Sequence, residues 1–264
     1  MKIQKEIEAI TRKELLLYLR FKLSYFFIAF VNPLLELIPF GIIYYGFLTY
    51  SGATSFAGID KANYLVFLIF GVLAHAFFNT GLHIFSAKFT EEKYWKTLEA
   101  IFIAPINYLS LIIGVGLSEI IRLAPTILLF FAIASFFFFP NIEIIIISLL
   151  SIFLIFLLCL SVGLIYGSIV VGNENFRPAL SYLFTGWSLA SCFFYPIGII
   201  PEMFRPIILA NPVYHGVNIM RNAWMHLPID YFSLAYLAIT ALVLPIIAVY
   251  IFRFCWKRLY ITGY

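Results

Sequence analysis

Six long runs of apolar residues dominate the chain, and only short polar segments separate them. The runs cover about 26–50, 64–86, 106–139, 142–172, 179–200 and 231–254. At 1.5 Å per residue, each run is long enough to cross about 30 Å of hydrocarbon as a helix. Polar and apolar residues do not alternate within them, so the pattern disfavours strands of a membrane β-barrel. It predicts an all-α integral membrane protein with six transmembrane helices in one domain over residues 26–254.

The segments outside these runs also carry helical patterns. In residues 1–25, apolar positions such as Ile3, Ile7 and Ile10 recur among basic ones, which predicts an amphipathic helix lying along the membrane interface. Residues 87–104 show the same pattern, with an apolar face and a charged face that includes Glu92 and is predicted to face the cytosol. This segment is interpreted either as a solvated helical connection or as a docking surface for a cytoplasmic partner.

The stretch between the fifth and sixth runs is irregular. Four prolines, Pro201, Pro206, Pro212 and Pro228, divide it into apolar pieces that are too short to cross a bilayer. Residues 197–230 are therefore predicted to form an external re-entrant or interfacial segment. Residues 255–264 form a predicted cytoplasmic tail.

Composition supports a membrane protein and charge sets its orientation. Of the 264 residues, 63% are hydrophobic and 11% charged, and the mean hydropathy is +1.01. A soluble surface needs far more charge.

With the N-terminus inside, thirteen Lys and Arg residues fall in inner segments and three in outer ones. The positive-inside rule thus places both termini in the cytoplasm and the protein in the cytoplasmic (inner) membrane. The net charge of +4 does not suggest nucleic acid as a partner.

An unpaired charge within a predicted span costs at least ~2.5 kcal/mol, and three ionisable residues in the spans are candidate functional residues: Glu36, Glu119 and Arg122. Glu119 and Arg122 are three residues apart, so they can pair on one helix. That pair is either structural or biases the opening of a transport path. Glu36 lies between Pro33 and Pro39 without a sequence neighbour of opposite charge. It must face protein, water or lipid headgroups, and it is a candidate residue of the translocation path.

The sequence shows no motif for metal binding, hydrolysis or ATP binding. The four histidines and three cysteines show no metal-ligand spacing, so no metal site is predicted. No nucleophile elbow and no G-x-x-x-x-G-K-[ST] phosphate loop occurs, so neither hydrolysis nor ATP binding is expected of this chain. Gly163 and Gly167 have the GxxxG spacing that allows close helix packing, either within the chain or between two chains.

Two motifs resemble type-2 (ABC-2) ATP-binding-cassette exporter permeases. The string EEKYWKTLEAIFIAPIN resembles their Gly-Thr-Leu-Glu loop: Thr97, Leu98, Glu99 and Pro105 match, while Lys96 replaces the usual Gly. Asn211-Pro212 and the following Arg221 resemble the Asn-Pro segment before the last span. The resemblance covers essentially the whole chain. It implies ATPase contacts in the 87–104 segment, at Phe89, Glu92, Trp95, Thr97, Leu98, Glu99, Ile101 and Pro105.

The resemblance also implies a transport subunit that is not itself an enzyme. Its partners would be a cytoplasmic ATP-binding subunit, which holds ATP and Mg, a second copy or a related permease, and membrane lipids. Such a complex would export an amphipathic substrate, which is drug-like, a lipid or a lipid-linked glycan. Two alternatives remain at this point: a secondary transporter driven by an ion gradient and a non-transporting membrane assembly protein.

Overall fold

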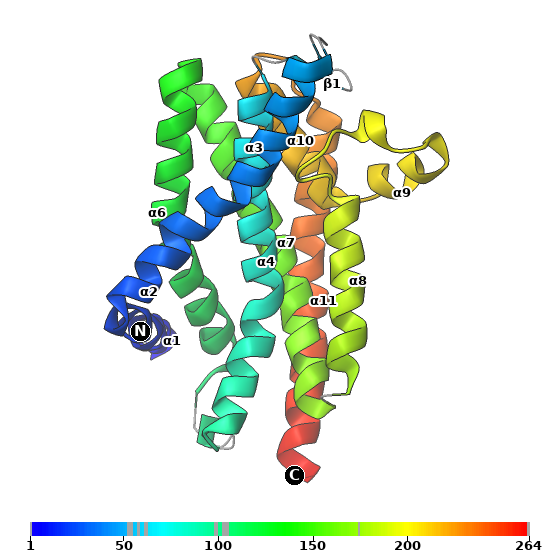
Figure 1. Ribbon diagram of the computed structural model, residues 1–264. Coiled ribbons are helices and arrows are strands. Elements are labelled where there is room, and N and C mark those ends of the chain that lie inside the picture. Colours follow the sequence, from blue (N-terminus) through cyan, green and yellow to red (C-terminus); the bar gives the residue numbers. More distant parts are fainter. Residues whose placement is uncertain are drawn as a thin grey trace.

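In the computed structural model the chain is a bundle of long helices that run side by side (Figure 1). The structure describes residues 2–51, 55–56, 59–60, 63–97, 100–101, 106–173 and 175–262. The long helices are α3 (Asn32–Ser51), α4 (Tyr64–Tyr94), α6 (Tyr108–Phe138), α7 (Ile142–Gly172) and α11 (Tyr231–Thr262). The shorter helices are α1 (Lys2–Arg20), α2 (Lys22–Phe26), α8 (Phe176–Ala190), α9 (Arg205–Leu209) and α10 (Pro212–Trp224).

Smaller elements join these helices. A π-helical turn, Phe27–Val31, links α2 to α3 without interrupting the helical path. Beyond α3, β1 (Ser55–Phe56) pairs antiparallel with β2 (Ile59–Asp60). Two 3₁₀ turns, Ile197–Ile199 and Glu202–Phe204, precede α9.

Five helices within the described ranges are long and apolar enough to cross a membrane. They are Lys22–Phe47, Tyr64–Tyr94, Tyr108–Phe138, Ile142–Gly172 and Tyr231–Cys255. The prediction of an all-α, multi-pass membrane protein is therefore confirmed. The remaining predicted run, 179–200, overlaps α8, which has 15 residues and is followed by non-helical backbone.

Helices α4 and α7 form the centre of the bundle. In their most apolar windows 72% and 56% of the residues are buried, against 11–22% for the other three candidate spans. Glycines let the two helices touch: a Cβ at Gly163 would lie 2.1 Å from the Gly81 carbonyl oxygen, and one at Gly167 would lie 2.8 Å from Phe85. The predicted GxxxG spacing thus serves packing within the chain.

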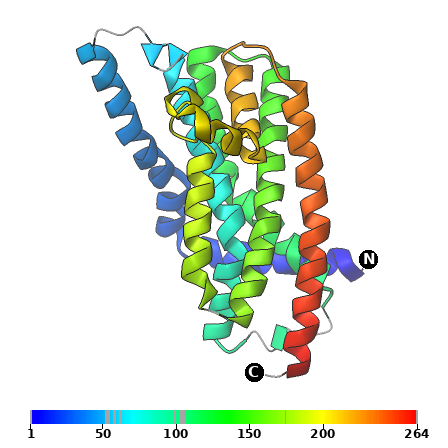
Figure 2. The same cartoon turned by 90° about the vertical axis from the view of Figure 1, so that its right-hand side faces the viewer.

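Both chain termini lie towards the same end of the bundle, which we call the terminal end (Figures 1 and 2). Helix α1 lies across the long helices there, whereas α4 and α11 extend past it (Figure 2). A break at Phe21, with φ −111° and ψ 66°, separates α1 from α2. Because α1 has an apolar face and a charged face, this crosswise position suits the membrane interface.

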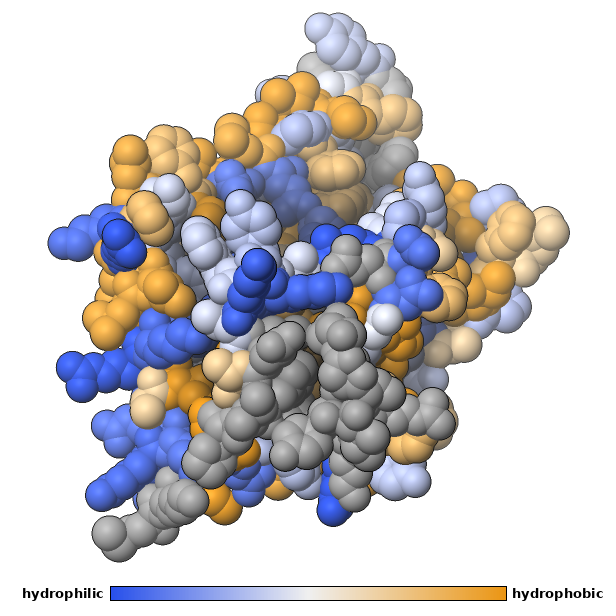
Figure 3. Space-filling view, turned by 90° about the horizontal axis from the view of Figure 1, so that it is seen from below, coloured by the Kyte–Doolittle hydropathy of each residue, from blue (hydrophilic) through white to orange (hydrophobic). Residues whose placement is uncertain are grey.

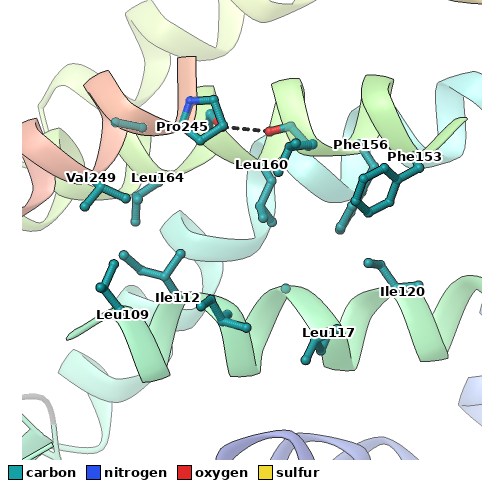
Figure 4. A pocket seen from close by; sticks show the side chains of 15 residues that line it. Leu109, Ile112, Leu117, Ile120, Phe153, Phe156, Leu160, Leu164, Pro245 and Val249 are labelled. Atoms are coloured by element: carbon teal, nitrogen blue, oxygen red, sulfur yellow. Dashed lines mark hydrogen bonds between the residues drawn. The ribbon is translucent and has the colours of Figure 1, made fainter. Parts of the chain in front are cut away.

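Helix α6 is set apart from α7 and α11 over part of its length. An apolar pocket of about 340 Å³ lies between the three helices (Figure 4). Ile112 and Leu117 line it from α6, Leu160 from α7, and Pro245 and Ala248 from α11. Because close packing is what makes helix contacts rigid, α6 is held less tightly against the centre than α4 and α7 are against each other.

Candidate functional site

The predicted docking segment 87–104 is not one separate helix. Residues 87–94 are the last two turns of α4, which continues to Tyr94, and a turn follows at Trp95 and Lys96. Lys96 has φ 57°, in the left-handed region that favours glycine. This conformation explains why Gly is usual at this position in the loop motif. Leu98, Glu99 and Pro105 lie outside the described residues, and Ile101 is helical and partly buried.

The large hydrophobic side chains that this segment exposes are a pair of aromatic rings. Tyr94 is 78% and Trp95 67% exposed, and their ring centroids lie 5.2 Å apart in an edge-to-face arrangement. Phe89 does not belong to this surface: it is 5% exposed and packs on Phe85 and Phe252. We call Tyr94 and Trp95 the aromatic elbow. Figure 3 shows hydrophilic side chains gathered over this end of the molecule, with apolar ones around its edge.

Glu92 differs from the prediction that it faces the cytosol. Its side chain is only 12% exposed and accepts a hydrogen bond of 2.9 Å from the Lys13 ammonium of α1. The Thr97 hydroxyl, from the turn after α4, donates to the same carboxylate. One helical turn earlier, Lys88 pairs with Glu14 at 2.6 Å, and Glu14 is 5% exposed. These four charged residues form the α1–α4 clamp, which ties the elbow to α1.

A second polar cluster ties the other part of α1 to α6. The Tyr18 hydroxyl donates to Glu119, and the Arg122 Nε donates to the same carboxylate, both at 2.5 Å. The Arg122 guanidinium also lies 5.2 Å from the centre of the Tyr18 ring. The Glu119 side chain is fully buried. The structure thus confirms the predicted Glu119–Arg122 pair and adds Tyr18 to it; we call the three residues the α1–α6 clamp.

A glycine allows α1 to come this close to α6. A Cβ at Gly114 would lie 2.8 Å from the Ile10 side chain of α1. Nearby, the Thr11 hydroxyl donates to the Gly114 carbonyl at 3.1 Å, and the Ser110 hydroxyl donates to Glu6 at 2.8 Å. Helix α1 therefore contacts α6 along several turns and is part of the packed structure.

Glu36 has a partner that its sequence neighbours do not show. Its carboxylate contacts Nδ1 of His75, which lies on α4. The other ring nitrogen of His75 is 3.0 Å from the Asn79 amide. Phe194 stacks on Phe40 and meets the His75 ring edge to face. The carboxylate therefore sits in a small polar cluster between α3 and α4 that is bordered by aromatic rings.

The predicted external residues anchor α10. Asn211 accepts from the backbone N–H of Val213 at 3.0 Å and from the Trp187 indole at 2.9 Å, and Pro212 opens the helix. Asn211 therefore joins the end of α8 to the start of α10. Arg221 is 3% exposed and donates to three backbone carbonyls, those of Phe67, Cys192 and Phe193. Arg221 therefore links α10 to α4 and to the backbone that follows α8, inside the bundle.

The comparison with protein families identifies this arrangement. The model of the ABC-2 type transporter family matches residues 5–225, which include most of α1, the elbow, both clamps and α10. The chain belongs to the ABC-2 type transporter family. No curated protein gives a significant match. As an ABC-2 type transporter protein, the chain is a membrane component of a transport system and is not itself catalytic.

Sequence reasoning missed four contributors to the clamps of this ABC-2 type transporter protein: Lys13, Glu14, Tyr18 and Lys88. The neighbouring Lys13 and Glu14 lie on an otherwise amphipathic helix, and nothing in their spacing shows that Glu14 turns inward. Only the tertiary contact with Lys88 explains the burial of Glu14. In the part of the chain described, no group of three or more His, Cys, Asp and Glu residues is arranged to hold a metal ion.

Proposed function

We propose that this chain is the permease subunit of an ABC exporter. It would move an amphipathic substrate outwards across the cytoplasmic membrane, and a separate subunit would hydrolyse ATP. The terminal end would face the cytoplasm, as the excess of Lys and Arg there requires. The observation that carries the proposal is the pair of clamps, which connect an exposed docking surface to a helix within the membrane.

A sixth crossing by α8 is part of this proposal. Helix α7 ends at the terminal end, and α11 begins at the opposite end (Figure 2). The chain between them must therefore return across the bundle. Its 15-residue helix is about 22 Å long, and non-helical residues after Ala190 continue it. With α8 included, six crossings bring both termini to one side.

The re-entrant segment corresponds to α10 in this proposal. Its 13 residues reach only about 20 Å, which is too short to cross a bilayer. Nevertheless nine of them are buried, including Arg221 and Trp224. The Trp224 indole donates to Ser148 of α7 at 2.8 Å and holds α10 against the bundle. In this proposal α10 would be the segment that re-enters from the external side.

The aromatic elbow would dock the ATP-binding subunit. Large exposed aromatic side chains are common anchors at protein interfaces because they bury much surface at little entropic cost. Movement of the elbow would pass through the α1–α4 clamp to α1 and then through the α1–α6 clamp to α6. Breaking a buried ion pair costs about 3–5 kcal/mol. The Lys88–Glu14 and Arg122–Glu119 pairs are largely buried, so each clamp contains one pair that could transmit force.

When the ATP-binding subunit moves the elbow, α6 would be displaced relative to the centre of the bundle. The pocket beside α6 provides the space, and Pro125 removes one of its internal hydrogen bonds. A second permease copy would complete the transport path, with Glu36 as a candidate path residue. Such rigid-body shifts of packed helices are a common way of coupling distant sites.

The docking role is tested by co-purification with an ATP-binding subunit encoded beside this chain. We expect Tyr94→Ala and Trp95→Ala each to weaken the association at least about tenfold, as substitution of an anchor residue does. Tyr231→Ala is the matched control, because Tyr231 is 68% exposed but lies at the opposite end of the bundle. Undiminished association and ATPase coupling in both elbow variants would contradict the proposal.

An ion-gradient transporter remains the second candidate because of the Glu36–His75 contact within the apolar helices. A carboxylate and an imidazole in contact can exchange protons. The two functions differ in their energy source. Transport by vesicles that contain ATP and the ATP-binding subunit but lack any ion gradient would support the exporter, and transport only with a gradient would support the alternative.

A further inference from the structure

A pocket with several polar side chains in its lining lies beside α4 on the side away from α1. Its volume is about 570 Å³, within the usual range for small-molecule sites. It is formed by the last turns of α4, the buried Tyr166 of α7 and the first turns of α8. The residues that line it are His83, Ser86, Ala87, Thr90, Glu91, Tyr94, Tyr166, Arg177 and Ser181.

Arg177 supplies a cationic group to this pocket. Its guanidinium donates to the Thr90 hydroxyl, which itself donates to the Ser86 carbonyl at 2.6 Å. No carboxylate in the described part of the chain pairs with Arg177. Glu91 also lines the pocket, but Lys88 pairs with it at 3.5 Å. The Arg177 guanidinium presents its donors in the planar geometry that suits phosphate and carboxylate.

The pocket lies at the depth of the membrane interface. Lys88 and Glu92 of α4 contact α1, and Thr90 lies between them in sequence but on the opposite face of the helix. The pocket is therefore level with the amphipathic α1. An amphipathic helix of this kind lies where lipid head groups meet the acyl chains.

Aromatic rings continue from the pocket along α4 and α8. His83, Tyr166 and Phe184 form one edge-to-face cluster, with centroids 5.0–6.0 Å apart. Further from the terminal end, Phe78 meets Trp187 edge to face at 5.2 Å. None of the residues of α8 is buried, so this helix presents apolar side chains such as Tyr182 and Leu183 to its surroundings. An apolar tail can follow this surface.

We propose that this pocket binds the anionic head group of an amphiphilic substrate, with Arg177 as the residue that recognises the charge. The aromatic rings along α4 and α8 would accept the apolar tail. The inference deepens the proposed exporter function and rests on it. It names the substrate class as amphiphiles that carry a phosphate, sulfate or carboxylate group.

Binding to the full-length chain in phosphatidylcholine nanodiscs tests this inference. Three probes are titrated: dodecyl phosphate, dodecyltrimethylammonium with the same tail, and inorganic phosphate. We expect dodecyl phosphate to bind most tightly and Arg177→Gln to weaken its binding roughly tenfold to a hundredfold, the loss typical of a hydrogen bond to a charged group. Arg177→Lys, which keeps the charge, should retain most of the affinity.

Arg253→Gln is the matched control, because Arg253 is an exposed cation of α11 that does not line the pocket. Equal binding of the cationic probe, or an equal loss in the Arg253 variant, would overturn the inference. Equally tight binding of inorganic phosphate would assign the pocket to free anions and also overturn it. Thermal unfolding of each variant shows whether it is folded.

The same variants separate this inference from the exporter proposal. If Arg177→Gln leaves dodecyl phosphate binding unchanged while the ATP-binding subunit still associates, the head-group site fails and the exporter function stands. If head-group binding depends on Arg177 but no ATP-binding subunit associates, the exporter function fails and the pocket remains an anionic-amphiphile site.

Discussion

The contact between α4 and α7 and the contact between α1 and α6 hold the molecule together in opposite ways. Between α4 and α7, backbone meets backbone at glycines, and large buried side chains fill the surrounding space. Between α1 and α6, charged and hydroxyl groups form most of the specific contacts, and a pocket lies on the far side of α6. The α4–α7 contact resists any displacement. The α1–α6 contact is strong at its polar clamp, but the pocket behind α6 leaves that helix room to shift.

This difference suits a protein that converts a push at one end into movement within a membrane. Dense packing favours one arrangement, since a small displacement loses many contacts at once. Polar clamps keep two helices together while the pair moves as a unit. The centre of the bundle can therefore act as the fixed frame, with α1 and α6 as the moving arm.

Breaking the α4–α7 contact should have the largest effect. Gly163→Ala places a Cβ 2.1 Å from the Gly81 carbonyl oxygen, so the helices must separate. We expect a loss of about 3 kcal/mol or more of stability, at the upper end for overpacked cores. Thermal unfolding in detergent measures it. Gly172→Ala is the control, because its Cβ would meet nothing within 4 Å, and equal melting temperatures for the two variants would refute the tight contact.

Breaking the α1–α6 clamp should have a smaller effect that is confined to the arm. Arg122→Gln leaves the fully buried Glu119 without its charged partner, which costs about 3 kcal/mol. We expect the bundle to stay folded while α1 loosens, so trypsin should cut faster at Arg20. The double variant Glu119→Gln/Arg122→Gln should recover most of the loss. If the two single losses simply add in the double variant, the residues do not form a coupled pair.

Filling the pocket beside α6 should have the smallest effect on stability and should mainly reduce the coupled ATPase activity. Ala248 is fully buried and lines the pocket, so Ala248→Leu adds apolar volume there. Such small-to-large changes cost about 1–3 kcal/mol, and the empty space of the pocket should keep the cost at the lower end. We expect ATPase activity coupled to this chain to fall several-fold, because α6 can no longer move inwards. Ala235→Leu, at an exposed position on the same helix, is the control. Unchanged coupling in Ala248→Leu would show that α6 does not move into this space.

The sequence predicted the long helices well because hydrocarbon imposes a simple rule on them. An apolar run of about 20 residues must form a helix, so the predicted run 142–172 coincides with α7. Where the chain leaves the apolar region the rule weakens. Residues 87–94 continue α4 beyond the predicted end at residue 86, since a helix does not stop when its side chains become polar.

The site was predicted less completely because its polar residues belong to different helices. The pairing of Glu119 with Arg122 follows from their spacing on one helix, and the structure confirms it. The partner of Glu36 lies on another helix, so no local pattern could reveal His75. For the same reason Glu92 was predicted to face solvent, although Lys13, 79 residues away, draws it inwards.

The sequence by itself determined the membrane class of the protein, the positions of its long helices and the amphipathic character of α1. These properties depend on the solvent that each side chain prefers, and each residue carries that preference wherever it lies. Only the tertiary structure decided which charges are paired, where α6 has room to move and which residues surround Arg177. Such features require groups from distant segments to meet, and their positions depend on the packing of every helix between them.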